Sequence, residues 1–367
     1  MKFLPYCASC AIFMVAFAGM AAAQQMEHFK MQKINDRVYA FIGWDPTLDL
    51  VDGNSYAIIT DEGVFVVDTH QPPICAEANI AEIRKLTDKP VKFVLNTHWH
   101  GDHNMGNFVY KKAYPDAKII SHAKTREILA RRQADWVKEA REGEYEKYIA
   151  DFGKMLSDGK GYSGQPITAV ERERMEKLLV ILKKYNQDVR RDEVCIPDMT
   201  FEKSLTLYMG GIEIQIRHDG RANTPGDAYV WLPQDRILIT GDILVSPIPY
   251  CFGSCFDEWP AVMDTMLALG PKIILPGHGE VMSDANYMTQ TRNFLADLYG
   301  RSKKAFESGI TAPDSLLKAV DMSDYKERFT NGDPALGWVF DNYAVNPAIP
   351  RILKILKGEL GDDLKAN

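Results

Sequence analysis

The chain has 367 residues, of which 46% are hydrophobic and 25% are charged. This is the composition of a globular protein, and the length suffices for one large domain with insertions or for two smaller domains. With 43 Lys and Arg residues against 50 Asp and Glu residues, the formal net charge is -7, and no run of basic residues stands out. Such a balance argues against nucleic acid or an anionic membrane as a partner, and a small-molecule or peptide substrate fits better.

The N-terminus has the features of a cleavable secretory signal peptide. Lys2 is followed by an apolar run at residues 11–23, which ends in Ala21, Ala22 and Ala23. A basic start, a short apolar core and small residues at the end are typical of such signals. The alternative is a membrane anchor, but a spanning helix needs about 20 apolar residues. We therefore predict a signal peptide at residues 1–23 and a periplasmic or secreted mature protein, without membrane attachment after cleavage.

Cleavage at this point would leave four cysteines, which are Cys75, Cys195, Cys251 and Cys255. In an oxidising compartment they allow three pairings, and the sequence does not choose among them. Cys251 and Cys255 are close enough in the chain to close a small loop, so a disulfide between them is favoured over metal ligation. Free, buried thiols are the alternative.

Short strands separated by turns are predicted after the signal. Apolar or alternating stretches predict strands at residues 38–42, 56–60, 64–68, 91–96 and 117–121. Apolar residues at helical spacing predict a helix at 76–86 between the third and fourth of these strands.

Residues 122–195 are predicted to form a helical insertion. From about Lys124 to Arg191 the sequence is dense in Lys, Arg and Glu, with apolar residues three and four positions apart. Thr168 and Glu171 have the spacing of a capping box, which predicts the start of a helix. We expect two or three helices with solvated charged faces, and we treat a role as a wall or lid of a site as a hypothesis.

Strands are predicted again beyond the insertion, at residues 201–208, 212–217, 228–232, 237–240 and 272–275. After Asn286 the sequence predicts helices to the end, one of them beginning near Thr311 and Pro313. Residues 291–367 are therefore predicted to be a C-terminal helical extension.

The clearest chemical motif is the segment THWHGDH at residues 97–103, which follows a predicted strand directly. Residues two apart on an extended chain point the same way, so His98 and His100 can bind one ion together. Gly101 permits a turn, after which Asp102 and His103 can face a second ion. Imidazole and carboxylate groups suit zinc or a similar divalent metal. Isolated histidines are usually structural, but this density favours a metal site.

Two later residues fit the same arrangement. Asp242 follows the predicted strand at 237–240, and His278 follows the one at 272–275. A rigid sheet can direct side chains that lie just beyond its strand ends. Taken singly, Asp242 could be a turn residue and His278 a helix-entry residue. Together with the histidine-rich segment, both are predicted metal ligands.

The order of these motifs resembles the metallo-β-lactamase superfamily. HxHxDH, NTPGDAYVWLP, TGD and PGHGE follow one another between about residues 35 and 290. The resemblance implies an α+β fold, a four-layer αβ/βα sandwich of two mixed β-sheets flanked by helices, with metals at one edge. It implies a catalytic domain at residues 24–290 and two divalent ions, zinc being the usual metal. The ligands that it implies are His98 and His100 for the first ion, Asp102, His103 and His278 for the second, and Asp242 between them.

One position departs from the family pattern. The family usually has a histidine before Thr-Pro-Gly, as a third imidazole for the first ion, and Asn223 stands there in this chain. An amide oxygen is a neutral, weak donor that favours oxygen-liking metals over zinc. We predict that Asn223 is a weak ligand and that the first site is loose, completed by water or filled by another metal. His218 is an alternative third ligand, although a structural role is the commoner one for such a histidine.

The resemblance implies a hydrolase. Metal-bound water with a pKa near 7, oriented by Asp102, would attack the carbonyl carbon of an ester, lactone or β-lactam. Tyr250 is a possible donor to the resulting oxyanion, although a packing role is commoner for a tyrosine. The loop after Asp242 lacks the early lysine of many β-lactamases of the family. The alternative is a non-hydrolytic relative, either an oxidoreductase with one metal ion or a metal-binding scaffold. The sequence predicts neither the substrate nor the oligomeric state.

Overall fold

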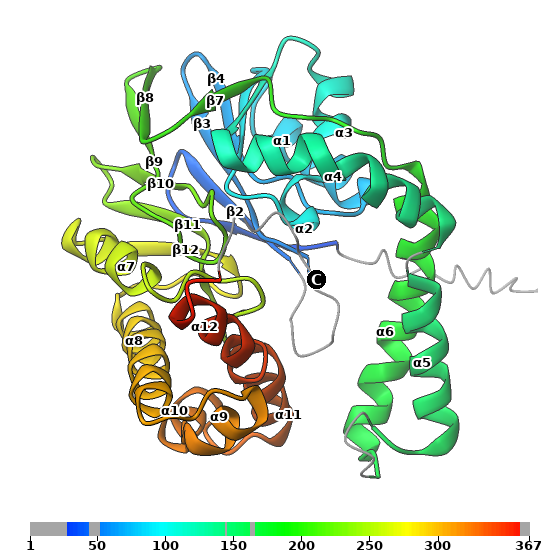
Figure 1. The fold of residues 1–367 in the computed structure, drawn as a ribbon. Coiled ribbons are helices and arrows are strands. Elements are labelled where there is room, and N and C mark those ends of the chain that lie inside the picture. Colours follow the sequence, from blue (N-terminus) through cyan, green and yellow to red (C-terminus); the bar gives the residue numbers. More distant parts are fainter. Residues whose placement is uncertain (1–27, 44–51, 144, 162–165, 360–367) are drawn as a thin grey trace, which may run out of the picture.

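The computed structural model describes residues 28–43, 52–143, 145–161 and 166–359. The predicted signal peptide, residues 1–23, lies outside these ranges. The described chain forms two β-sheets with helices on their outer faces (Figure 1).

The first sheet has seven strands in sequential order. They are β1 (Lys30–Lys33), β2 (Val38–Ile42), β3 (Ser55–Thr60), β4 (Gly63–Val67), β5 (Val91–Asn96), β6 (Lys118–His122) and β7 (Met199–Phe201). The pairs from β1 to β4 are antiparallel and the pairs from β4 to β7 are parallel, so the sheet is mixed.

The second sheet has five strands in the order β12-β11-β10-β9-β8. They are β8 (Ser204–Met209), β9 (Ile212–Arg217), β10 (Tyr229–Leu232), β11 (Ile237–Val245) and β12 (Ile273–His278). Only the β11–β12 pair is parallel, so this sheet is mixed too. The strand predicted at 201–208 is wrong as one element. Phe201 ends β7 in the first sheet and Ser204 begins β8 in the second, and the two residues between them carry the chain across.

An apolar core lies between the two sheets. In β9 the residues Ile212, Ile214 and Ile216 are buried while their neighbours are partly exposed, which is the period-two pattern of a strand with one face in a core. They pack in one cluster with Val38 and Ile58 of the first sheet. This core fixes the two sheets face to face.

Helices complete the outer layers. On the first sheet lie α1 (Pro73–Leu86) and α3 (Asn107–Ala113), which share an apolar cluster with its strands. On the second sheet lie α7 (Trp259–Ala268) and α8 (Asn286–Glu307). The result is the four-layer α+β sandwich that the family resemblance implied. Short α2 (Gly101–Asn104), α3 and α7 were not predicted from the sequence.

The segment predicted as an insertion contains three helices, α4 (Ala123–Glu142), α5 (Tyr145–Asp158) and α6 (Ala169–Asp188). Helix α6 begins directly after Thr168, as the capping-box spacing predicted. Helices α5 and α6 pair as a hairpin that projects beyond the sheets (Figure 1). Its base is fixed to the body because the carboxylate of Asp188 accepts a hydrogen bond of 2.6 Å from the backbone of Ile74 in α1.

The C-terminal part is helical, with α9 (Pro313–Ala319), α10 (Ser323–Thr330), α11 (Pro334–Val339), the π-helix η3 (Phe340–Val345) and α12 (Ala348–Leu356). These helices pack with α7 and α8 in the apolar cluster that covers the second sheet. In the described part of the chain, no helix is both long and apolar enough to cross a membrane.

Candidate metal centre

The candidate metal centre lies where ends of both sheets meet. The HxHxDH segment follows β5, Asp242 lies within β11, and His278 ends β12. Two glycines allow this approach. Gly241 has a φ of +52°, and a Cβ atom there would lie 2.6 Å from the Cβ of Thr97. A Cβ atom at Gly277 would collide with the carboxylate of Asp242. The strands can come together here because neither position carries a side chain.

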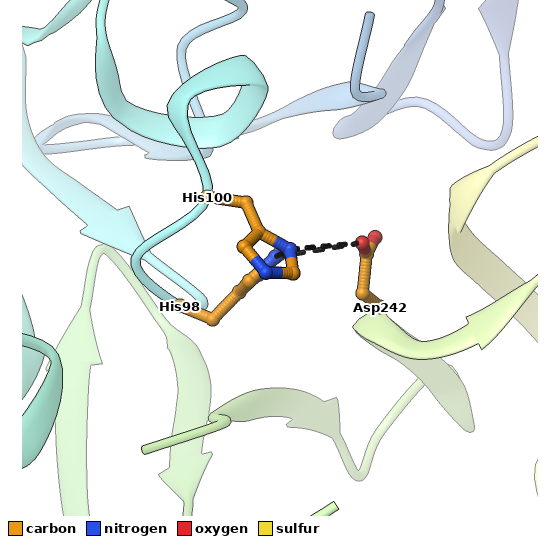
Figure 2. A group of neighbouring side chains, drawn as sticks. All are labelled: His98, His100 and Asp242. Carbon is orange, nitrogen blue, oxygen red and sulfur yellow. Dashed lines mark hydrogen bonds and ion pairs between the residues drawn. The ribbon is translucent and has the colours of Figure 1, made fainter. Parts of the chain in front are cut away.

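A first group of side chains consists of His98, His100 and Asp242, whose ligand atoms face one another (Figure 2). The Nε2 of His98 lies 2.9 Å from the Nδ1 of His100 and 3.4 Å from the Oδ2 of Asp242. The Nδ1 of His100 lies 3.8 Å from the same oxygen. His98 and Asp242 are buried, whereas the side chain of His100 is 25% exposed. The first group therefore opens to solvent beside His100.

A second group consists of Asp102, His103 and His278. The Oδ2 of Asp102 lies 3.3 Å from the Nε2 of His103 and 3.1 Å from the Nε2 of His278. The two Nε2 atoms are 3.2 Å apart. Both histidines are buried, and Asp102 is 15% exposed. Residues from two separate regions of the sequence thus converge on one point.

Asp242 joins the two groups. Its Oδ2 faces His98, while its Oδ1 lies 3.2 Å from the Nε2 of His103 and 3.4 Å from the Nε2 of His278. One carboxylate therefore offers one oxygen to each group, which is the bridging position that the motif implied.

The spacing within the groups suits bound metal ions. An ion with tetrahedral ligands at about 2.0–2.1 Å places neighbouring ligand atoms about 3.3 Å apart. The separations in the second group, 3.1 to 3.3 Å, are close to this value, and those in the first group are less regular, from 2.9 to 3.8 Å. The donors are imidazole nitrogens and carboxylate oxygens, which zinc and similar ions accept. The residues present thus fit two divalent ions.

The hydrogen bonds behind His98 direct its Nε2 toward the first group. The hydroxyl of Thr97 donates to Asp68 at 2.7 Å, so its oxygen accepts from the Nδ1 of His98 at 3.0 Å. That leaves the Nε2 as the nitrogen with a free lone pair. Burial and the nearby charge of His103 lower the pKa of His98 to about 4, so this imidazole is neutral at neutral pH.

The pKa values of the histidines in the second group are shifted in the opposite direction. Burial works against their protonated forms, but the carboxylates of Asp242 and Asp102 outweigh it. These charges hold the pKa of His103 well above its ordinary value and raise the pKa of His278 to about 9. The pKa of Asp102 is well below its usual range, since the charges of both histidines overcome the effect of burial.

Asp68 supports the centre and was not predicted from the sequence. Its Oδ2 accepts a hydrogen bond of 2.9 Å from the Nδ1 of His103, and its Oδ1 accepts one of 2.8 Å from the backbone N–H of Thr97. A carboxylate behind an imidazole fixes the orientation of the ring and makes it a stronger ligand. The sequence analysis placed Asp68 inside the strand predicted at 64–68, whereas β4 ends at Val67 and leaves Asp68 just beyond the strand end.

Asn223 lies beside the first group. Its amide nitrogen is 3.4 Å from the Oδ2 of Asp242, and its amide oxygen accepts a hydrogen bond of 3.2 Å from Ser254. In this orientation the nitrogen, not the oxygen, faces the ligands, and a half-turn of the amide would exchange the two. Ligation by Asn223 stays a prediction. The turn is held by the buried carboxyl of Asp227, which accepts from the backbone of Thr224 at 2.6 Å.

His218 is in neither group. Its ring stacks on His122 with the centroids 4.0 Å apart, and its Nδ1 donates to the carbonyl of Asp227 at 2.7 Å. The structural role is therefore the one observed. Tyr250 is buried, and its ring centroid lies 5.3 Å from that of His278. This places Tyr250 at the edge of the second group.

Of the two alternatives for Cys251 and Cys255, a disulfide and free thiols, the structure has the free thiols. Both are free thiols, as are Cys75 and Cys195. The backbone of Cys251 is bonded to Tyr343 and that of Cys255 to Ala222, so each cysteine is anchored to a different part of the fold.

Helix α4 of the inserted segment approaches the first group. The ring of Trp99 lies 4.4 Å from that of His100, and Trp136 of α4 stacks on Trp99 at 5.7 Å. The inserted segment therefore forms part of the surroundings of the metal centre, in line with the hypothesis that it is a wall of the site.

Comparison with known proteins defines the class. The family model of the metallo-β-lactamase superfamily matches residues 48–278. The chain therefore belongs to the metallo-β-lactamase superfamily, as the motifs predicted, and its relatives of this fold are metallohydrolases such as alkylsulfatase and β-lactamase.

Among individual proteins, a linear primary-alkylsulfatase from Pseudomonas sp. is 25% identical over 281 residues, which are 73% of this chain and 50% of that protein. The chain thus spans half the length of this curated relative. A metallo-β-lactamase structure from Pontibacter korlensis is similar with a TM-score of 0.52 and 18% identity, over 73% of this chain and 98% of that one. A sec-alkylsulfatase structure from Pseudomonas sp. reaches a TM-score of 0.60 at 16% identity, over 89% of this chain and 50% of that one. At these identities the two structures confirm the fold.

Proposed function

We propose that the protein is a hydrolase that holds two divalent ions, with zinc as the first candidate, and cleaves a small carbonyl compound such as an ester, lactone or β-lactam. The observation that carries the proposal is the geometry of Asp242. One of its oxygens belongs to a group with His98 and His100, and the other faces a group with His103 and His278. Paired sites with a shared carboxylate suit the activation of water beside a polarised substrate.

The proposed roles follow from the side chains. Divalent ions bound in the two groups would lower the pKa of water to about 7, so that hydroxide is available at neutral pH. Asp102 is partly exposed while His103 and His278 are buried, so Asp102 lies on the side from which water can enter. We assign to Asp102 the orientation of the attacking hydroxide. The phenol of Tyr250, beside His278, is a candidate donor to the developing oxyanion.

The test is metal content combined with a substrate panel. Purified protein should bind two equivalents of zinc, measured by plasma mass spectrometry. The zinc-loaded protein should hydrolyse at least one of a nitrophenyl ester, a lactone, a chromogenic cephalosporin or a phosphoester. Failure on the whole panel would overturn the hydrolase proposal. One iron per chain with oxygen uptake would support the non-hydrolytic alternative instead.

A second candidate substrate is a sulfate ester. A linear primary-alkylsulfatase from Pseudomonas sp. is 25% identical over 73% of this chain, which makes the kind of substrate in its name a candidate here. A linear alkyl sulfate therefore belongs in the panel. Sulfate release without ester or lactam cleavage would favour this candidate over the carbonyl compounds.

We also propose export, from the sequence features of residues 1–23. Expression of the full chain in a bacterium, followed by fractionation and intact-mass measurement, tests it. A periplasmic product that begins near Gln24 is expected, and an uncleaved product retained in the cytoplasm would contradict the proposal.

A further inference from the structure

A group of aromatic rings adjoins the candidate metal centre. We call it the aromatic wall, and it consists of Tyr250, Phe252 and Tyr343. The ring of Tyr250 lies 5.5 Å from that of Tyr343 and 6.1 Å from that of Phe252, and the rings of Phe252 and Tyr343 are 5.3 Å apart. Each ring thus contacts the other two, which fixes their arrangement.

The wall is continuous with the metal centre. Tyr250 is buried, and its ring packs 5.3 Å from the ring of His278. Phe252, whose ring also contacts Tyr250, has 52% of its surface exposed. Tyr250 thus connects the second group of ligands to an exposed phenyl ring.

The composition of the loop indicates what the wall recognises. Between Asp242 and Phe256 the sequence ILVSPIPYCFGSC contains no charged residue. Ionic recognition of a substrate cannot come from this loop, and its exposed element is a phenyl ring. Covering an exposed ring with an apolar group removes both surfaces from water, which is favourable in proportion to the area buried.

The C-terminal helices hold the wall in place. The backbone N–H of Cys251 donates to the carbonyl of Tyr343 at 2.9 Å, and the Nε of Arg351 donates to the carbonyl of Ser254 at 3.0 Å. Tyr343 itself lies in the π-helix η3. π-Helical turns are rare in proteins, and those that occur are often found at functional sites. They reorient side chains relative to a regular helix.

We propose that the aromatic wall binds the apolar group of the substrate, and that Phe252 and Tyr343 determine specificity for it. The substrate class is then an ester whose acyl group is a medium-length alkyl chain or a ring, in preference to a short or charged acyl group. This inference rests on the proposed function for the reacting bond, and it adds that the C-terminal helices form part of the substrate site.

The first experiment measures kcat/KM of the zinc-loaded protein on p-nitrophenyl acetate, butyrate and octanoate. The octanoate-to-acetate ratio should be high in the unaltered protein and should fall roughly tenfold in Phe252→Ser. The acetate value itself should change less than twofold, since we expect the short acetyl group to contact Tyr250 at most and not Phe252. The matched control is Tyr208→Ser on β8, which removes a ring that is 78% exposed at the opposite edge of the second sheet.

Tyr343 is tested with two variants, because its replacement could disturb the loop. Tyr343→Phe keeps the ring and should keep the ratio, whereas Tyr343→Ser should lower it. Thermal unfolding of each variant shows whether the fold is retained. A ratio that stays within twofold in both Phe252→Ser and folded Tyr343→Ser overturns the proposal, while the hydrolase assignment would stand.

A binding measurement separates the wall from the chemistry. Isothermal titration of the zinc-loaded protein with octanoate and with acetate requires no turnover. Octanoate should bind more tightly than acetate, and Phe252→Ser should weaken octanoate roughly tenfold without affecting acetate. This result without cleavage of any substrate of the panel would support the wall and overturn the hydrolase proposal. Equal affinities for octanoate and acetate would overturn the proposal that the aromatic wall binds the apolar group.

Discussion

The two ligand groups contain similar residue types but differ in what surrounds them. In the second group His103 and His278 are buried and face carboxylates, and Asp68 supports the ring of His103 from behind. In the first group His100 is partly exposed, and the position of the family's third imidazole holds Asn223. Two sites that share Asp242 can therefore differ in strength. The difference has two sources, which are the missing imidazole in the first group and the groups that orient and neutralise the ligands of the second.

The pKa values of the histidines also differ between the two groups. Burial lowers the pKa of His98 to about 4, whereas carboxylates raise that of His278 to about 9. Without metal His98 is thus less protonated than His278 at pH 7. The following predictions test this comparison, from the largest expected effect to the smallest.

Removal of a ligand from the second group should have the largest effect. His103→Ala should lower hydrolytic activity by about 10³-fold or more, because the better-supported ion is lost and with it the activation of water. Metal analysis should show one equivalent fewer. His98→Ala is the matched variant for the first group. Equal loss of both ions in each single variant would contradict two separable sites.

Removal of the support behind His103 should have an intermediate effect. Asp68→Asn should weaken metal binding at the second group about 10–100-fold, because Asp68 contacts His103 directly. The first group should weaken less, because Asp68 reaches His98 only through the hydroxyl of Thr97. Competition with a chromophoric chelator measures both affinities. Asp61→Asn, at a side chain that is 80% exposed, is the control. The same affinity in both variants would show that the carboxylate of Asp68 does not support the site.

Restoration of the missing imidazole should strengthen the first group. Asn223→His should tighten zinc binding there, by about tenfold, since imidazole is a better zinc ligand than an amide. The second group should serve as the internal reference in calorimetry. Unchanged zinc stoichiometry and affinity would count against the assignment of Asn223 to the first group.

The smallest effect is in proton release. At pH 7 the second group should release about one to two protons when it binds metal, because His103 and His278 must lose theirs. His98 is already neutral and should release no proton when metal binds. The His103→Ala variant keeps only the first group, so its metal binding should release fewer protons than that of His98→Ala, which keeps the second group. Raising the pH toward 9 should therefore strengthen binding at the second group most. Calorimetry in two buffers of different ionisation enthalpy counts the protons, and equal counts would refute the pKa contrast.

Local patterns in the sequence were sufficient for much of the fold and the site. The HxHxDH segment, Asp242 and His278 were predicted because each stands next to a recognisable strand. Asp68 was missed because its role depends on the pairing of β4 with β5, which brings it beside Thr97. The change from the first sheet to the second between Phe201 and Ser204 was missed because the sequence of β7 and β8 reads as one uninterrupted strand. Proximity in the chain favoured a disulfide between Cys251 and Cys255 over metal ligation, but it does not show what holds each cysteine, and the structure has free thiols.

The lack of a side chain at Gly277 has a consequence for how the protein tolerates mutation. Even a methyl group there would press on the carboxylate of Asp242, which both groups share. A substitution at Gly277 would thus disturb both ions at once, although the residue binds nothing itself. In a saturation mutagenesis screen this glycine should be as intolerant as a ligand, because the clearance of the backbone limits the site as strictly as its donor atoms do.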